Sequence, residues 1–115
     1  MVSFPKRGEI YWTRFDPVIG SEQGGTRPAV VVQNDVGNRF SPTVVVAALT
    51  SQFPRKHYPF LAELPRGMTP RPSLVNCCQI RTVDKSRLSG EPIASLDTDT
   101  MRAVDDALRA SLGLY

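Results

Sequence analysis

Alternating and continuous runs of apolar residues indicate that the chain is mainly β structure. Polar and apolar positions alternate along residues 6–15, which predicts a half-buried first strand. Residues 29–32 and 43–49 are continuous apolar runs, and such runs are typical of buried strands. In the first strand we expect an inward face with Ile10, Trp12 and Phe15, and an outward face with Glu9, Tyr11 and Arg14.

The remaining β elements are shorter or are bounded by turn residues. Residues 60–64 are short and alternating, which predicts an edge strand, and residues 73–82 predict the last long strand. Residues 83–88 fit either a short final turn or a strand. The expected connections are turns at 34–39 and at Ser41-Pro42, a basic exposed loop at 53–59 and a turn-rich connector at 65–72.

One amphipathic helix is predicted near the end of the chain. Asp97 lies where an N-cap residue would lie, Asp99 follows in the first turn, and Gly113 is a natural stop. The apolar stripe that would pack on the sheet consists of Met101, Val104, Leu108 and Leu112. The sequence therefore predicts one α+β, mainly β domain over residues 1–115, a small, strongly bent antiparallel sheet or barrel followed by a helix.

A polar loop leads directly into the first core strand. Gly24-Gly25 allows the backbone to turn sharply, and Pro28 lacks the N–H that a central strand would donate. The connection up to Thr26 is long for a hairpin, which makes it a candidate binding loop. Arg27 then lies at the hinge, with its guanidinium free to face whatever the loop covers. The alternative is an ordinary surface arginine after a Gly-Gly turn.

The distribution of charge indicates which kind of partner the protein could bind. The chain has 115 residues, 41% of them hydrophobic, and a net charge of +3. Four aspartates against two arginines give residues 96–115 a charge of −2, so residues 1–95 carry +5. Most of the cations are arginines, whose planar donors suit phosphate, and a polyanionic partner is therefore plausible.

Apolar segments that would direct the chain to a membrane are not found in the sequence. No apolar run approaches the length of a membrane helix, and Met1–Gly8 lacks the apolar stretch of a signal peptide. We therefore expect a cytoplasmic protein that crosses no membrane.

The common catalytic and metal-binding constellations are absent as well. Cys77 and Cys78 are adjacent, so on a strand they would point to opposite faces, one buried and one less buried. His57 is the single histidine, and we interpret it as a solvated loop residue; a zinc site is not expected. Any catalysis would then depend on Arg, Thr, Ser, Glu or Asp.

Five segments, taken in their order along the chain, carry a resemblance to a known family. They are Arg7–Tyr11, Gly20–Pro28, Val32–Asp35, Ala48–Gln52 and Gln79–Leu88, followed by Ser-Leu-Gly-Leu at residues 111–114. In this order they resemble the signature segments of the MazF/PemK toxins, the endoribonuclease halves of bacterial toxin–antitoxin pairs. The resemblance implies an SH3-like barrel with helical additions, a homodimer, and cleavage of single-stranded RNA at short sequences without a metal or other cofactor.

The resemblance also implies roles for individual residues. Arg27 would be the principal catalytic residue and Thr50 its partner, in a reaction where the ribose 2′-hydroxyl attacks the adjacent phosphorus and leaves a 2′,3′-cyclic phosphate and a 5′-hydroxyl. Arg27 would act as an acid, while the general base stays open because a free arginine's pKa is too high for an efficient base. The expected RNA contacts are Ser21, Glu22, Gln23, Gly24, Phe53, Gln79 and Arg81, with Tyr58 as a second candidate for stacking.

Several alternatives to these roles remain open. The aromatic side chains could simply pack or be exposed, and Arg81 could be a structural or interface ion-pair residue. Cys78 departs from the family, whose members commonly have an acidic side chain there, and this affects the expected sequence preference. The implied partner is a MazE-like antitoxin that covers the basic groove with an acidic, initially disordered segment. The alternative functions are a CcdB-like toxin that inhibits DNA gyrase, and a barrel that binds RNA without cutting it.

Overall fold

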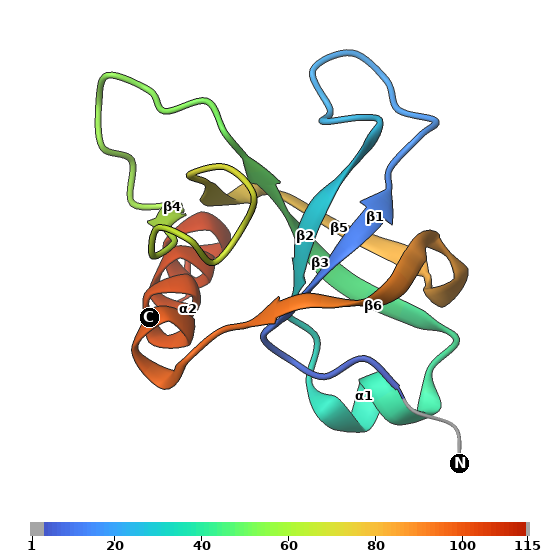
Figure 1. Cartoon of the computed structure of the whole chain (residues 1–115). Coiled ribbons are helices and arrows are strands. Elements are labelled where there is room, and N and C mark those ends of the chain that lie inside the picture. Colours follow the sequence, from blue (N-terminus) through green and yellow to red (C-terminus); the bar gives the residue numbers. More distant parts are fainter. Residues whose placement is uncertain (1–3, 115) are drawn as a thin grey trace.

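Six strands form one antiparallel sheet in the computed structural model, which describes residues 4–114. The order across the sheet is β4-β5-β3-β2-β1-β6 (Figure 1). Residues 1–3, the start of the Met1–Gly8 segment that lacks the apolar stretch of a signal peptide, lie outside the described residues. The strands are β1 (Glu9–Arg14), β2 (Thr26–Val31), β3 (Thr43–Thr50), β4 (Leu61–Glu63), β5 (Leu74–Asp84) and β6 (Leu88–Ser95). The helices are α1 (Asp35–Phe40), the 3₁₀ helix η1 (Lys85–Arg87) and α2 (Thr98–Leu112).

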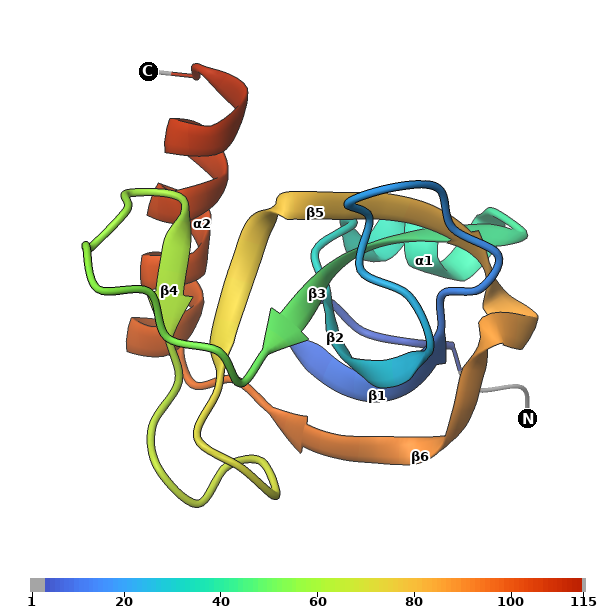
Figure 2. The ribbon, with the colours of Figure 1, turned by 90° about the horizontal axis from the view of Figure 1, so that it is seen from above.

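The sheet bends strongly but does not close. The register between β3 and β5 shifts between Ala47 and Leu49, and the register between β1 and β6 shifts between Ile10 and Trp12. Such irregularities bend a strand and increase its twist. Figure 2 shows β5 turning sharply and the sheet curling around, with β4 and β6 left as its edges. The predicted bent, mainly β architecture with a C-terminal helix is thus confirmed.

Strands β2 and β3 are buried on both faces. Alternate residues of β2 point into two different cores, because successive side chains of a strand face opposite sides. One core, here called the helix-side core, includes Val30, Ala47 and Leu49 together with Val104 and Ala107 of α2. The other, here called the loop-side core, consists of Tyr11, Phe15, Ala29, Val31, Val44, Val46, Ala48 and Val83, with Val18 packed against it. This double burial explains the continuous apolar runs of the two strands.

The predicted facing of β1 is wrong for Trp12 and Tyr11, but right for Phe15 and Arg14. Tyr11 and Phe15 are buried in the loop-side core, Thr13 is fully buried, and Trp12 is 41% exposed. Ile10 is buried as predicted, but on the opposite, helix-side face. The Tyr11 hydroxyl donates to a Glu9 carboxylate oxygen at 3.0 Å, and burial with this contact raises the pKa of Tyr11 to about 12. Both faces of this strand have apolar residues, so alternation alone could not select the inner one.

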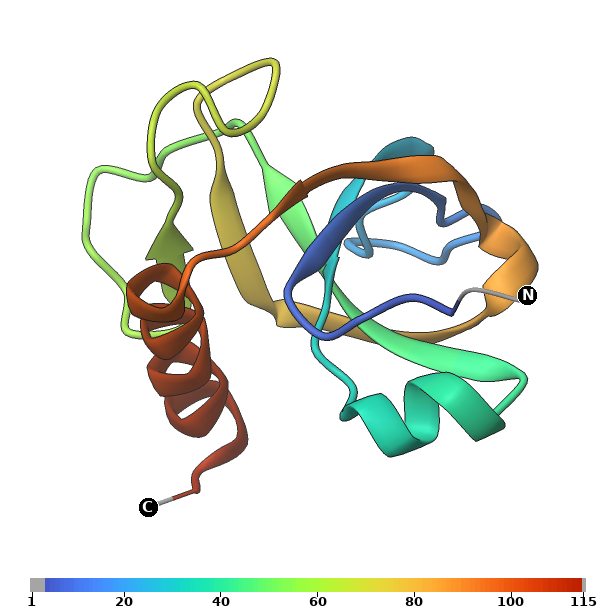
Figure 3. The same ribbon diagram turned by 60° about the horizontal axis from the view of Figure 1, so that its bottom comes forward.

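Two elements differ from their predicted type. The expected turn at 34–39 is the short helix α1, which connects β2 to β3 (Figure 3). Its N-cap, Asn34, accepts a hydrogen bond from the backbone N–H of Gly37 at 2.8 Å, a geometry that turns and short helices share. Val83 and Asp84 extend β5 beyond the predicted strand, and β6, which pairs with β1 at the edge of the sheet, was not predicted.

The C-terminal helix begins and ends where the sequence predicts. The Asp97 carboxylate accepts a hydrogen bond from the backbone N–H of Thr100 at 2.7 Å, and Gly113 ends α2 in the left-handed conformation, with φ of 70°. Val104 is fully buried, but Leu112 is 58% exposed, so the last residue of the predicted stripe lies beyond the sheet. Among residues 4–114, no helix has both the length and the apolar character needed to span a membrane.

Replacing Asp97 by Ala should destabilise the fold in a pH-dependent way. The N–H of Thr100 holds the pKa of Asp97 below its ordinary value. A carboxyl whose pKa is lowered by folding contributes its full stabilisation above the unfolded-state pKa and loses it as the pH falls through the folded-state pKa. We therefore expect the Asp97→Ala melting temperature to lie below wild type at pH 7, with the difference shrinking below about pH 4.

Asp99→Ala is the matched control, because Asp99 is an exposed acid in the same turn that does not cap the helix. Thermal melts of the three proteins between pH 7 and pH 3 measure the effect. A difference between Asp97→Ala and wild type that stays constant across this range would contradict a role for the ionised cap.

Candidate functional site

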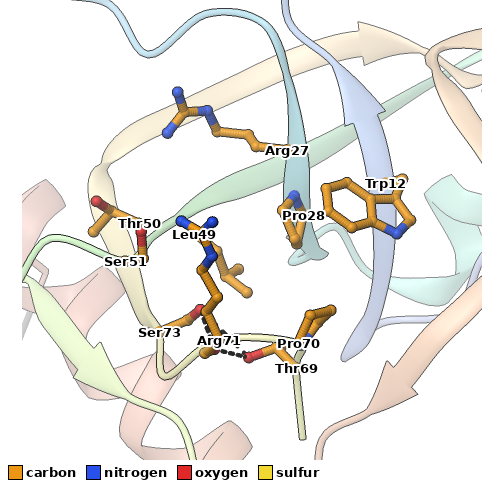
Figure 4. A pocket seen from close by; sticks show the side chains of 10 residues that line it. All are labelled: Trp12, Arg27, Pro28, Leu49, Thr50, Ser51, Thr69, Pro70, Arg71 and Ser73. Carbon is orange, nitrogen blue, oxygen red and sulfur yellow. Dashed lines mark hydrogen bonds between the residues drawn. The ribbon is translucent and has the colours of Figure 1, made fainter.

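Arg27 and Thr50 line one pocket of about 270 Å³. Arg27 follows the long loop of residues 15–25 and Thr50 precedes the long loop of residues 51–60. Both loops extend from the same end of the sheet (Figure 1). Figure 4 shows the side chains around the pocket. No carboxylate is present among its lining residues, which are Trp12, Arg27, Pro28, Leu49, Thr50, Ser51, Thr69, Pro70, Arg71 and Ser73. The pocket is therefore suited to an anion.

The register of β2 and β3 explains why these two residues meet. Ala29 pairs with Ala48, so the same antiparallel register continued by two residues places Arg27 opposite Thr50. The ladder ends before it reaches them, because Pro28 has no N–H to donate to β3. On its other side Pro28 still lies opposite Trp12 of β1. The strands are thus free to part at Pro28, and the pocket opens between them.

Arg27 is held by the loop that precedes it. Its Nε–H donates to the carbonyl oxygen of Gly24 at 3.0 Å, which leaves the two terminal nitrogens of the guanidinium for the pocket. A Cβ on Gly24 would come within 2.7 Å of an Asp16 carboxylate oxygen and 2.8 Å of a Val18 methyl group, so any larger residue there would force one of these side chains to move. Gly25 has φ of +73° and donates its N–H to the same Asp16 carboxylate at 2.9 Å.

Thr50 presents its hydroxyl with one hydrogen-bonding role already filled. Its Oγ1 accepts a hydrogen bond from the backbone N–H of Gln52 at 3.2 Å. The hydroxyl proton remains available to donate, which is the role that a negatively charged oxygen in the pocket would require. Thr50 is the last residue of β3 and is paired with Leu74 of β5, so its backbone is fixed by the sheet.

A second cleft of about 190 Å³ lies beside the loop and contains most of the predicted base-contacting residues. It is lined by Phe15, Glu22, Gln23, Ala48, Cys78, Gln79, Ile80 and Arg81. The backbone N–H of Gln23 donates to the Gln79 amide oxygen at 3.1 Å, and Asn76 donates to the Gln23 amide oxygen at 3.3 Å. Two amides and a carboxylate in one cleft provide the donors and acceptors that base edges need.

Arg81 holds the loop by its terminal nitrogens. They donate to the carbonyl oxygens of Phe15 and, at 3.1 Å, of Pro17, and the guanidinium carbon lies 5.9 Å from the centre of the Phe15 ring. Arg87 donates to the carbonyl oxygens of Arg14 and Asp16. These contacts support the structural alternative for Arg81 and attach the loop to β5 and its extension.

Glu22 also has a structural contact within the loop. Its carboxylate accepts a hydrogen bond from the backbone N–H of Ile19 at 2.6 Å, and the N–H of Glu22 donates to the carbonyl of Ile19 at 3.2 Å. Ser21 is exposed in the loop and lines neither the pocket nor the cleft. The predicted contacts within residues 21–24 therefore divide between loop closure, the cleft and the support of Arg27.

Phe53 lies apart from these residues on the second long loop. It is 48% exposed and lines a hollow of about 220 Å³ with Arg55, Lys56 and His57. All residues from 53 to 59 are exposed, as predicted for a basic loop. Tyr58 is 39% exposed and stacks on Phe60 with 5.2 Å between the ring centres, so it is partly packed within its own segment.

Sequence reasoning missed Trp12, Arg71 and Asn76. Trp12 was assigned to a buried face, although the Tyr-x-Thr-x-Phe pattern from Tyr11 to Phe15 offered an equally regular inner face. Arg71 belongs to a connector whose direction depends on tertiary packing, so no local signal indicated it. Among residues 4–114, no group of three or more histidine, cysteine, aspartate or glutamate side chains is arranged to hold a metal ion.

Comparisons with known proteins assign this architecture to a family. Residues 6–112 match the model described as PemK-like, MazF-like toxin of type II toxin–antitoxin system. The chain is 49% identical over 111 residues to Endoribonuclease EndoA of Bacillus subtilis (strain 168), and the match covers 95% of each chain.

Two solved structures resemble the whole fold. The crystal structure of MazF from Deinococcus radiodurans superposes with a TM-score of 0.83 at 29% identity, over 97% of this chain and 99% of that one. An endoribonuclease in complex with its cognate antitoxin, from Mycobacterial species, superposes with a TM-score of 0.78 at 28% identity, over 96% and 97% of the two chains.

The two cysteines should differ sharply in reactivity. Cys78 is exposed at the cleft, whereas Cys77 is buried and its burial raises the pKa of its thiol to about 12. Because the thiolate is the reactive form, iodoacetamide at pH 8 should label one thiol in the native protein and two after unfolding. Mass spectrometry of the peptides locates the label. Native Cys78→Ser protein serves as the control and should take up none; labelling of Cys77 in native protein would contradict its burial.

Proposed function

The chain belongs to the PemK-like, MazF-like toxins of type II toxin–antitoxin systems, and we propose that it is an endoribonuclease that cuts single-stranded messenger RNA at a short sequence without a metal ion. The observation that carries this proposal is the pocket in which Arg27 and Thr50 meet with no carboxylate beside them. The relatives found are MazF toxins and endoribonucleases, which does not favour the alternative of a gyrase inhibitor.

The proposed reaction is an internal displacement at phosphorus. The ribose 2′-oxygen forms a bond to the adjacent phosphorus while the bond from phosphorus to the 5′-oxygen of the next nucleotide breaks. The 2′-hydroxyl loses its proton and the departing 5′-oxygen gains one, so the products are a 2′,3′-cyclic phosphate and a 5′-hydroxyl. DNA lacks the attacking hydroxyl and should not be cut.

Arg27 is suited to stabilise the transition state of this reaction. Negative charge increases on the non-bridging phosphate oxygens, and a guanidinium already fixed at that place stabilises it without solvent reorganisation. The bond from Nε to Gly24 fixes the side chain and leaves its terminal nitrogens available to the pocket that Arg27 lines. The Thr50 hydroxyl donates a hydrogen bond to the same oxygens, because its Oγ1 already accepts one from the N–H of Gln52. In this scheme Arg27 also protonates the leaving oxygen, and the general base is not assigned.

The cleft beside the loop is the proposed site of base recognition. Gln23, Gln79 and Glu22 supply amide and carboxylate groups to base edges, and single-stranded RNA exposes those edges. Phe53, which is half exposed on the other long loop, offers a face on which a base can stack. The remaining residues that we propose for RNA binding are Ser21, Gly24 and Arg81. Gly24 and Arg81 also act indirectly, because Gly24 supports Arg27 and Arg81 supports the loop.

The proposal includes the partners expected for such a toxin. An antitoxin with an acidic, initially disordered segment would compete with RNA for the arginines of the pocket, and one structural relative is an endoribonuclease in complex with its cognate antitoxin. We also propose a homodimer, and a cytoplasmic location because messenger RNA is its substrate.

Replacing Arg27 by Ala should lower the rate of cleavage by at least about a hundredfold, the usual order for losing one donor to a developing oxyanion. The measurement is single-turnover cleavage of a long, weakly structured RNA in EDTA, with the cut ends mapped and the 3′ ends typed. Wild type should cut at one short sequence and leave cyclic phosphates. The same RNA with a 2′-deoxy nucleotide at the cut should stay intact.

Arg102→Ala provides the matched control, because Arg102 is an exposed arginine on α2 that lines neither the pocket nor the cleft. It should cut at the wild-type rate. A folded Arg27→Ala protein that cuts at a near-normal rate would remove Arg27 from the mechanism. Intact RNA with folded wild-type protein would instead refute the endoribonuclease proposal itself.

A further inference from the structure

Arg71 is the second cation of the pocket that contains Arg27. It belongs to the connector between β4 and β5, far from Arg27 in the sequence, and lies outside the five segments that carry the family resemblance. Figure 4 shows its side chain rising from residues 69–73 toward Thr50, with its guanidinium on the side of the pocket that Arg27 also faces. Two strands and a connector thus bring two guanidinium groups to one cavity.

The backbone of Arg71 is held by a small buried network. Its carbonyl oxygen accepts hydrogen bonds from the Thr69 hydroxyl at 2.6 Å and from the Ser73 hydroxyl at 2.9 Å. Thr69 is only 9% exposed and Ser73 only 7% exposed, and their hydroxyl oxygens lie 3.3 Å apart. A hydrogen bond in such a place is protected from competition with water. The connector therefore presents Arg71 from a fixed backbone position although its side chain is exposed.

The charge around the two arginines is not balanced by protein groups. Within residues 4–114, neither Arg27 nor Arg71 forms an ion pair, and the pocket is lined by no aspartate or glutamate. The hydroxyl groups of Thr50 and Ser51 line it as well. Two guanidinium groups with neighbouring hydroxyl donors match the oxygens of a phosphodiester, since arginine binds phosphate through paired N–H donors.

We propose that Arg71 contacts the scissile phosphate opposite Arg27 and stabilises its charge in the transition state. This inference rests on the proposed function, because it adds a second catalytic arginine to the same reaction. Arg27 approaches from β2 and Arg71 from the connector before β5, so the phosphate is held between two separately anchored cations. Two cations share the charge that a single one would otherwise have to stabilise.

The test compares Arg71→Ala, Arg71→Lys and Arg66→Ala with wild type. Arg66 is the matched control, because it is an exposed arginine on the same connector that does not line this pocket. With the protein in saturating excess over an RNA that contains one mapped cut site, the single-turnover rate of Arg71→Ala should fall about ten- to a hundredfold. Arg71→Lys should recover part of the rate because it restores the charge but not the planar pair of donors. Arg66→Ala should cut at the wild-type rate.

Binding gives a second readout that does not require cleavage. The probe is the same RNA with a 2′-deoxy nucleotide at the cut site, titrated against each protein at several salt concentrations. The slope of log affinity against log salt should become shallower by about 0.7 for Arg71→Ala, the value for one phosphate contact on a single strand, and should not change for Arg66→Ala.

The outcomes separate this inference from the proposed function. If wild type fails to cut RNA, the endoribonuclease proposal fails first. If wild type cuts and Arg71→Ala cuts at the same saturated rate, Arg71 has no part in the transition state and the inference is wrong, whatever the salt slope shows. A reduced saturated rate in a protein with an unchanged melting temperature supports it, since Arg71 is exposed and its loss leaves both cores intact.

Discussion

Burial of both faces of β2 and β3 is the constraint on which the rest of the structure depends. Side chains of these strands alternate between the helix-side core and the loop-side core. A change of strand register by one residue would move each side chain from one core to the other. The register that pairs Ala29 with Ala48 is therefore fixed. It brings Arg27 and Thr50, from opposite ends of their strands, to the same end of the sheet. Hydrophobic packing thus sets the position of the polar site.

The site itself depends on interruptions of that regular pairing. Pro28 ends the ladder between β2 and β3 where the pocket opens, and Gly24 permits the close approach to Asp16 that shapes the loop before Arg27. The guanidinium of Arg81 attaches the same loop to β5. The strands thus make the site rigid. Pro28 opens the pocket, and Gly24 and Arg81 shape and hold the loop beside it. This is the usual division between a scaffold and the loop that it carries.

The sequence predicted those parts of the fold and site whose signal is local. The predictions of β2 and β3 from their apolar runs, of the caps of α2 and of the position of Arg27 agree with the structure, because each depends on only a few consecutive residues. The sequence did not predict three other features, because each depends on what packs against it. They are the facing of Trp12, the strand β6 and the direction of the connector at Arg71. β6 contains Gly90 and Pro92 and lies at an edge, so it has no apolar alternation to reveal it.

The places proposed for chemistry and for base recognition are separate but connected in this architecture. The pocket has cations and hydroxyls but no side-chain amide, whereas the cleft has the amides of Gln23 and Gln79. Cys78 lies in the cleft, so under the proposed function its departure from the family pattern would affect which sequence is recognised. One short segment joins the two places, because Gln23 contacts Gln79 and the next residue, Gly24, accepts the hydrogen bond from Arg27. Under the proposed function, a base that displaced Gln23 would shift the support of Arg27, and the bound sequence would then influence the rate of cutting through these two hydrogen bonds.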